Sequence, residues 1–169
     1  AHTLAGLIKK HSPKTIVIVG GPHVDALPIQ SAQEFPNFDI IVYGEAEDTF
    51  LELCQRLQKK KSLAGCKGIV HRVKGKIVKE LPRPLIKDLD KLPYAARDIV
   101  NFDNYKKAHV ERGLSRKFTN IMEFMASRGC PAKCIFCGSG ALKPPTLRFR
   151  SLQHVLGEVD ECVKSYGTN

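Results

Sequence analysis

The sequence lacks any apolar run long enough to cross a membrane. A membrane-spanning helix needs about 20 consecutive apolar residues, and no stretch of this 169-residue chain approaches that length. The N-terminal segment AHTLAGLIKKHSPKT also lacks the apolar stretch and small-residue cleavage site of a secretory leader. It has no initiator methionine, so we expect the natural chain to start before residue 1. These absences predict a cytoplasmic protein without a membrane span.

Aromatic residues are scarce among the many basic ones. Lys and Arg number 27 against 17 Asp and Glu, which gives a formal charge of +10, but aromatics make up only 7% of the chain. The basic residues are spread along the sequence, and the run Lys59–Lys61 ends a predicted helix, where cations complement the negative end of the helix dipole. This pattern argues against nucleic acid as the partner. An anionic cofactor or a nucleic-acid-like substrate remains open.

Hydrophobic residues make up 43% of the chain, enough for a packed core. Residues 1–61 alternate between helical and strand patterns. We predict helices over residues 4–11, 25–35 and 47–59 and strands over 16–19 and 39–43, with Phe50, Leu51, Cys54 and Leu57 on the inner face of the third helix. This alternation predicts an open parallel α/β sheet. Because two parallel strands leave much apolar surface uncovered, we expect only part of a domain.

The rest of the sequence, after residue 61, predicts a hairpin, a connector and a second α/β segment. Residues 69–78 form the hairpin, with its turn at Lys74 and Gly75, and a proline-containing connector follows over 81–98. Residues 99–118 give no clear assignment, and residues 120–127 read as a strand. The final predicted helix begins at Ser151 as N-cap and ends at Gly167 as C-cap. Its expected inner face consists of Val155, Leu156, Val159 and Val163.

Three of the six cysteines, Cys130, Cys134 and Cys137, lie within the stretch CPAKCIFC, with no fourth nearby. In a reducing compartment, clustered cysteines are typical of metal ligands or catalytic groups. Structural zinc requires four protein ligands, whereas three thiolates can hold a 4Fe–4S cluster and leave one iron open. Three buried structural thiols or a zinc knuckle are the alternatives. The isolated Cys54, Cys66 and Cys162 are expected to be buried apolar thiols, and His154 a helix-surface residue.

The stretch CPAKCIFC resembles CxxxCxΦC, the cluster motif of the radical S-adenosylmethionine (SAM) superfamily, where Φ is an aromatic residue. The resemblance implies that Cys130, Cys134 and Cys137 bind a 4Fe–4S cluster. It implies that the open iron binds SAM, which the reduced cluster cleaves to a 5′-deoxyadenosyl radical. Phe136 would pack near the adenine of SAM.

Further segments look like successive pieces of cobalamin-binding radical SAM proteins, in matching order. They are IVIVGGPHVDALP, DIIVYGEAEDTFLEL, IKDLDKLPYAARD and RFRSLQHVLGEV. The resemblance implies half of a Rossmann-like cobalamin-binding domain over residues 1–65, a hairpin and linker over 66–118, and the start of a partial TIM-type barrel over 119–169. The chain would thus be an internal fragment of a longer enzyme.

The same resemblance implies cobalamin contacts at the ends of the two predicted strands. These contacts would involve Gly20, Gly21, Gly44 and Glu45. A glycine pair at a strand end permits the close approach of a large ligand, although a plain tight turn is the alternative. The sequence departs from the family at Ala46, where a second glycine is common. The segment whose histidine can ligate cobalt would precede residue 1, and many relatives lack that histidine.

The leading hypothesis is therefore a fragment of a radical SAM enzyme with cobalamin-dependent chemistry, such as methyl transfer or ring rearrangement. The resemblance implies a small-molecule or cofactor-precursor substrate and an electron donor such as flavodoxin or ferredoxin. No catalytic residue is assigned, because substrate groups in such barrels come from later strands. The alternatives are a zinc or iron–sulfur module without radical chemistry and a basic RNA-binding domain.

Overall fold

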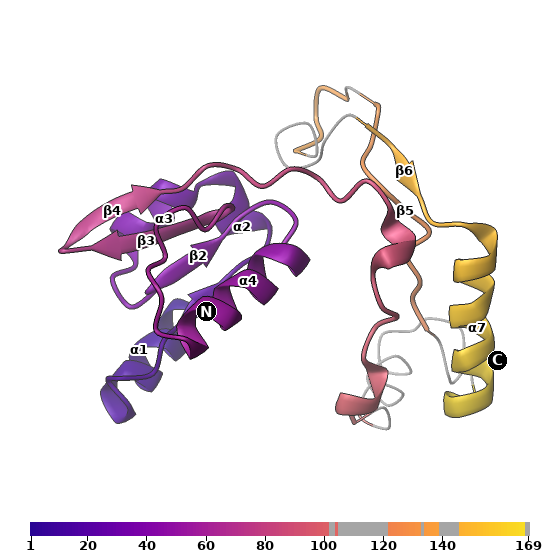
Figure 1. Ribbon diagram of the computed structural model, residues 1–169, viewed down its shortest axis with the longest axis horizontal. Coiled ribbons are helices and arrows are strands. Elements are labelled where there is room, and N and C mark those ends of the chain that lie inside the picture. Colours follow the sequence, from indigo (N-terminus) through magenta and orange to yellow (C-terminus); the bar gives the residue numbers. More distant parts are fainter. Residues whose placement is uncertain (102–103, 105–121, 133, 139–145, 168–169) are drawn as a thin grey trace. The chain divides into compact units, whose positions relative to one another are not determined.

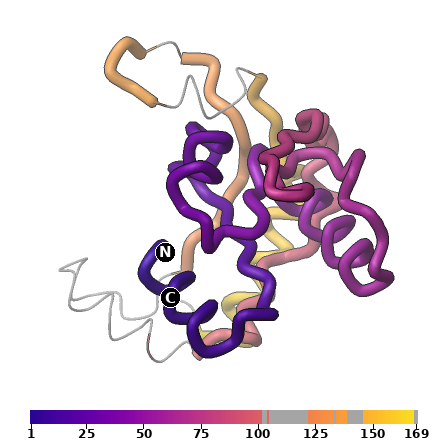
Figure 2. The backbone as a smooth tube through the Cα atoms, turned by 90° about the vertical axis from the view of Figure 1, so that its left-hand side faces the viewer, coloured from indigo at the N-terminus to yellow at the C-terminus, as the bar shows by residue number. Residues whose placement is uncertain are grey.

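The computed structural model describes residues 1–101, 104, 122–132, 134–138 and 146–167. The chain divides into two compact units. The first contains residues 1–86 and 134–142, and the second contains 87–133 and 143–169. Figure 1 labels the helices and strands, and Figure 2 follows the same chain as a tube. The prediction of a strand at 120–127 is wrong over its described part, where only Ser127 belongs to a strand. Residues 120–121 and most of the unassigned segment 99–118 lie outside the described residues.

A four-stranded mixed sheet forms the centre of the first unit. Its strand order is β1-β2-β3-β4, with bounds Ile18–Val19, Ile40–Val42, Ile69–Val73 and Lys76–Lys79. β1 and β2 are parallel, as the sequence predicts, and β2 pairs with β3 in the antiparallel direction. The predicted hairpin is confirmed, and it extends the sheet instead of standing apart from it. β1 is shorter than expected because the Val17 N–H donates to the Asp39 side chain at 2.7 Å instead of joining a strand ladder.

Helices cover both faces of this sheet (Figure 1). Their bounds are His2–His11 for α1, Pro22–Ala26 for α2, Pro28–Glu34 for α3 and Glu47–Gln58 for α4. One buried cluster contains Ile41 and Val70 together with residues of α1, α2 and α3, and the other contains Ile40, Ile69 and Leu53 of α4. Successive strand residues therefore face opposite layers. Burying each large aliphatic side chain contributes roughly 1.5–3 kcal/mol.

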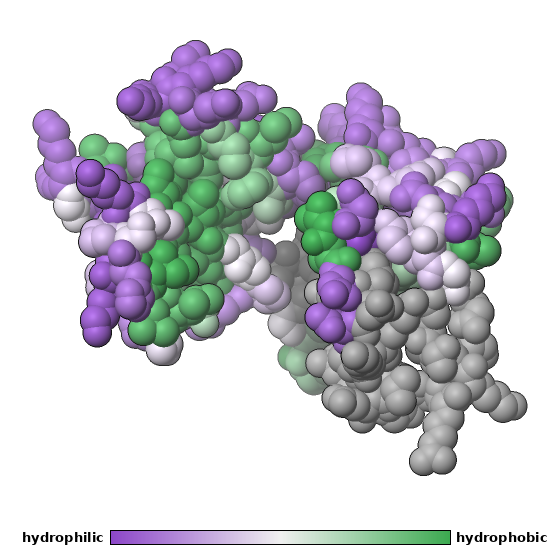
Figure 3. All heavy atoms as spheres, turned by 90° about the horizontal axis from the view of Figure 1, so that it is seen from below, coloured by the Kyte–Doolittle hydropathy of each residue, from purple (hydrophilic) through white to green (hydrophobic). Residues whose placement is uncertain are grey.

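Two helix predictions for the first unit need correction. The single helix expected over 25–35 is two short helices, because Pro28 begins α3 at a position where its missing N–H costs nothing. The inner face of α4 is rotated from the expected one. Thr49 and Leu53 are buried, whereas Phe50 and Leu51 are 48% and 59% exposed. Hydrophobic surface is prominent on the first unit in Figure 3, and the unit also exposes Leu4, Leu7 and Ile16.

The second unit is built on a short strand pair and one long helix. β5, Ser127–Arg128, pairs antiparallel with β6, Arg148–Phe149, and α7 spans Leu152–Tyr166. Two 3₁₀ turns, Leu89–Lys91 and Arg97–Ile99, precede them in the chain. The predicted caps of α7 are confirmed. The Ser151 side chain accepts from the His154 N–H at 3.1 Å, and Gly167 is left-handed at φ 62°.

The inner face of α7 differs from the prediction in a similar way. Leu156 and Val163 are about half exposed, whereas Glu158 and Cys162 are 3% and 0% exposed. A carboxylate therefore occupies the centre of the buried face, where the sequence predicts aliphatic residues. None of the described helices is long and apolar enough to span a membrane.

Candidate functional site

The four predicted cobalamin-binding residues lie at one edge of the first unit's sheet. Gly20 and Gly21 follow β1, and Gly44 and Glu45 follow the adjacent parallel strand β2. The three glycines are exposed. Gly21 and Gly44 have φ values of +105° and +77°, and a Cβ added to either would meet no atom within 4 Å. The backbone is therefore open at both strand ends, and a positive φ at each favours glycine.

Side-chain hydrogen bonds fix the loops at this edge. The Gly44 N–H donates to Asp25 Oδ1 at 2.6 Å, which ties the end of β2 to helix α2. The Ile86 N–H donates to Glu45 Oε2 at 2.8 Å. One carboxylate oxygen of Glu45, a predicted cobalamin-binding residue, therefore already accepts a hydrogen bond from the protein backbone. Sequence reasoning did not single out Asp25, although an aspartate one short helix after a glycine pair is a signal for this kind of loop bracing.

The cysteine loop begins where β5 ends. Gly129, at φ +100°, turns the chain immediately before the half-buried Cys130. Cys134 and Cys137 are exposed, and the Cys137 N–H donates to the Cys134 carbonyl oxygen at 3.1 Å, so both lie in one turn. The Phe136 side chain is 89% exposed. Among the described residues, no three His, Cys, Asp or Glu side chains are grouped so as to hold a metal ion.

The other three cysteines divide into two kinds. Cys66 and Cys162 are 0% exposed, as predicted, and burial raises the pKa of each thiol. Cys54 is exposed on α4, so the prediction of a buried thiol there is wrong. This prediction failed because the buried face of α4 is rotated from the expected one. Cys54 is consequently an accessible thiol on a helix of the first unit, outside the CxxxCxΦC loop.

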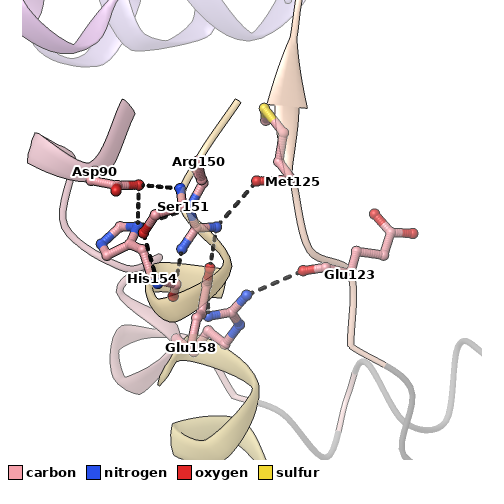
Figure 4. Close-up of polar contacts among 8 residues, drawn as sticks. Asp90, Glu123, Met125, Arg150, Ser151, His154 and Glu158 are labelled. Carbon is pink, nitrogen blue, oxygen red and sulfur yellow. Dashed lines mark hydrogen bonds and ion pairs between the residues drawn. The ribbon is translucent and has the colours of Figure 1, made fainter. Parts of the chain in front are cut away.

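A polar network in the second unit surrounds the start of α7 (Figure 4). Asp90 Oδ1 accepts from the Ser151 N–H at 2.9 Å. Hydrogen bonding from the Ser151 side chain and from its backbone N–H lowers the pKa of the Asp90 carboxyl. His154 is half-buried, and its Nδ1 accepts from Arg150 Nε at 2.9 Å. The His154 ring also packs against Tyr94 at 4.8 Å between ring centroids. These contacts place His154 in a structural role on α7.

Glu158 is the buried member of this network. Its carboxylate accepts from Arg97 Nη1 at 2.6 Å and from Arg150 Nη1 at 2.5 Å. Burial raises the pKa of Glu158, but the hydrogen bonds from the two arginines outweigh burial and hold the pKa below its usual value. Sequence reasoning missed this residue. The available signal was its position between Val155 and Cys162 on the inward stripe of α7, with arginines just before the helix.

Comparison with known proteins identifies the class of protein. The chain is a relative of the cobalamin-dependent radical SAM enzymes. It is 35% identical over 167 residues to an uncharacterized methyltransferase of Pyrococcus horikoshii, a match that covers 99% of the chain and 34% of that relative. It is 33% identical over 151 residues to TokK of Streptomyces tokunonensis, a cobalamin-dependent radical SAM methyltransferase, covering 86% of the chain and 21% of TokK.

Relatives also include an anaerobic magnesium-protoporphyrin IX monomethyl ester cyclase of Synechocystis, 29% identical over 133 residues, which cover 78% of the chain and 24% of that protein. The chain therefore spans about a third or less of the length of these relatives. No family profile matches it.

Solved structures share the fold. The radical SAM methyltransferase TsrM of Kitasatospora setae superposes with a TM-score of 0.74 at 16% identity, covering 99% of the chain and 31% of TsrM. The cobalamin-dependent radical enzyme OxsB also gives 0.74, at 22% identity over 98% of the chain and 21% of OxsB. TsrM has been solved with cobalamin and a 4Fe–4S cluster, and OxsB with aqua-cobalamin and SAM. The resemblance and the α/β fold predicted from the sequence are thereby confirmed.

Proposed function

We propose that this chain carries the cluster loop and part of the cobalamin-binding domain of a radical SAM enzyme that transfers a methyl group. The single observation that carries the proposal is the CxxxCxΦC loop, which follows β5 directly in a chain related to such enzymes over nearly its whole length. Cys130, Cys134 and Cys137 are the cluster ligands of this proposal. Phe136 would pack near the adenine of SAM.

The donor chemistry of the loop fits a 4Fe–4S cluster. Thiolates are the ligands that iron–sulfur clusters prefer, and three of them leave one iron for SAM. Cys134 and Cys137 are exposed, and a Cβ at Gly138 would meet no atom within 4 Å, so the loop has room to close around the cluster. When bound and reduced, the cluster supplies the electron that cleaves the SAM sulfonium. A reduced flavodoxin or ferredoxin in the cytoplasm is the electron donor that suits this chemistry.

The glycine edge of the first unit fits a large flat ligand. Open space over Gly21 and Gly44 lets cobalamin approach the backbone closely, and Gly20 extends the same edge. Glu45 belongs to this proposed contact set through its position, with one carboxylate oxygen shared with Ile86. The proposed substrate is a small molecule or cofactor precursor, bound by the rest of the enzyme.

The complete protein provides the test. We expect anaerobic reconstitution with iron, sulfide and hydroxocobalamin to give about four iron atoms and one cobalt per chain. Cys134→Ala should lose most of the iron and the paramagnetic signal of the reduced protein, because two thiolates cannot hold the cluster, and should keep its cobalt. Cys54→Ala removes an equally accessible thiol outside the loop, so it is the matched control and should retain both metals.

Two results would count against the proposal. Unchanged iron in Cys134→Ala would exclude the loop as the cluster site, and stoichiometric zinc that iron cannot displace would favour a zinc module. Ring formation is the second candidate reaction, because the relatives include cyclases. S-adenosylhomocysteine is a product of methyl transfer from SAM and not of ring formation, so its appearance with turnover separates the two.

A further inference from the structure

Glu158 holds two arginines that come from separate parts of the second unit. Arg97 lies near the end of the connector and is buried, with 8% of its surface exposed, and Arg150 lies between β6 and α7. Their guanidinium groups donate to different oxygens of the Glu158 carboxylate, Arg97 to Oε1 and Arg150 to Oε2. A buried carboxylate between two cations stabilises an arrangement that would otherwise bring two like charges together.

Both arginines also donate to the backbone that leads into the cysteine loop. Arg97 Nη2 donates to the Glu123 carbonyl oxygen and Arg150 Nη1 to the Met125 carbonyl oxygen, each at 3.1 Å (Figure 4). The Arg150 N–H adds a hydrogen bond of 2.9 Å to the Ala126 carbonyl oxygen. Three hydrogen bonds therefore hold the segment immediately before β5.

Side-chain packing adds to these attachments at Phe124. The Glu123, Met125 and Ala126 side chains are exposed, whereas Phe124 is half-buried and Arg97 Cζ lies 5.2 Å from the centroid of its ring. The β5–β6 pairing consists of two residue pairs. The packing of Phe124 thus also depends on Arg97, one of the two arginines that Glu158 holds. Hydrogen bonds from charged donors are among the strongest available to this segment.

We propose that Glu158 is a positioning residue for the cluster loop, acting through Arg97 and Arg150 on residues 123–126 and thereby on Cys130, two residues beyond β5. This inference rests on the proposed function, because it assumes that Cys130 ligates the cluster. In this proposal Glu158 acts through the two arginines and not by contact with the cluster or the substrate. Its effect is on the position of the first ligand and therefore on how firmly and in what geometry the cluster is held.

The experiment uses the complete reconstituted protein with Glu158→Gln. This variant keeps the side-chain shape but turns an amide N–H toward one arginine, so that arginine is no longer held. We expect the cluster to assemble, to lose iron to a chelator roughly 10-fold faster, in the range found when groups behind metal ligands are removed, and to give an altered line shape in the electron paramagnetic resonance spectrum with SAM bound. Asp160→Asn makes the same carboxylate-to-amide change at an exposed position of α7 and should match the wild type.

Arg97→Lys is the second variant, in case Glu158→Gln fails to fold. Lysine keeps the charge but lacks the planar fork that donates to Glu158 and Glu123 at once, so a change in the same direction is expected. If the wild type and both variants share one spectrum and one rate of iron loss, Glu158 has no positioning role, while the proposed function stands. A wild type that assembles no cluster overturns both.

Discussion

Gly68 shows how one residue couples the hairpin to helix α4. Its φ is +81°, and an added Cβ would lie 2.7 Å from Thr49 Oγ1 and 3.3 Å from the Tyr43 carbonyl oxygen. Thr49 is fully buried, and its hydroxyl accepts from Arg83 Nε at 2.8 Å, so it has little room to move. Both the backbone conformation and the space therefore require glycine at this position.

Replacing Gly68 by alanine should destabilise the first unit by about 2–4 kcal/mol, which combines left-handed strain with crowding of a packed core. Gly75→Ala is the matched control. Its φ of +80° is nearly the same, but nothing lies within 4 Å of the added Cβ, so only the strain of about 1–2 kcal/mol applies. Chemical denaturation of both variants measures the difference. Equal losses would mean that crowding against Thr49 contributes nothing.

At the scale of elements, local patterns predicted which segments form helices and strands. The caps of α7 and the turn at Lys74 and Gly75 depend on residues close in sequence. They could therefore be predicted from the sequence alone. Pro28 also carried a readable signal, since proline begins a helix more readily than it continues one.

Which side of a helix faces the core was harder to predict. On α4, residues 49, 53 and 57 and residues 50, 54 and 57 both recur at helical spacing, and the second set is more apolar. The buried set is the first, because Thr49 is paired with Arg83 and lies against Gly68, two partners distant in sequence. On α7, Glu158 is buried for a similar reason, since its two arginine partners compensate for the desolvation of its charge.

The features of the candidate site also differ in whether the local sequence could predict them. The cysteine spacing and the glycine pairs are local and could be read directly, and the resemblance they carry holds over nearly the whole chain. The brace from Asp25 to Gly44, the attachment of Glu45 to Ile86 and the Arg97–Glu158 contact join residues 19, 41 and 61 positions apart. Such contacts depend on the fold and leave little trace in the local pattern.

The Glu158 network predicts how the second unit responds to acid. The pKa of Glu158 is lowered in the folded state, so its charge stabilises the fold above the unfolded-state pKa of about 4.3 and ceases to do so as pH falls through the lower folded-state value. Glu158→Gln should therefore cost about 3–5 kcal/mol near pH 7, and this loss should shrink as the pH falls below the unfolded-state pKa and through the lower folded-state one.

Thermal unfolding of the wild type and Glu158→Gln across this pH range is the measurement. The two midpoints should converge in acid, while Asp160→Asn should follow the wild type throughout. A gap of constant size from neutral to acidic pH would mean that the ionised carboxylate is not the source of the stability.

At the scale of the whole molecule, the two units have separate buried residues. The first is organised around Ile41, Leu53 and Ile69 on the two faces of its sheet, and the second around Leu89, Cys162 and the Glu158 network. The proposed cobalamin edge belongs to the first unit, and so do Cys134 and Cys137, whereas Cys130 belongs to the second. The glycine edge contains none of the three cysteines, which is why loss of the cluster in Cys134→Ala is expected to leave cobalt bound.

Hydrogen exchange in the complete protein can test this separation. Proteins open in cooperative units, and distant substitutions without shared partners act independently. Gly68→Ala should speed exchange of amides in β2, β3 and β4 and leave α7 unchanged, whereas Glu158→Gln should speed exchange in α7 and β5 only. In the double variant each region should exchange as it does in the corresponding single variant. If Glu158→Gln also speeds exchange in β3, the two units open as one, and loss of the cluster would then be expected to weaken cobalamin binding as well.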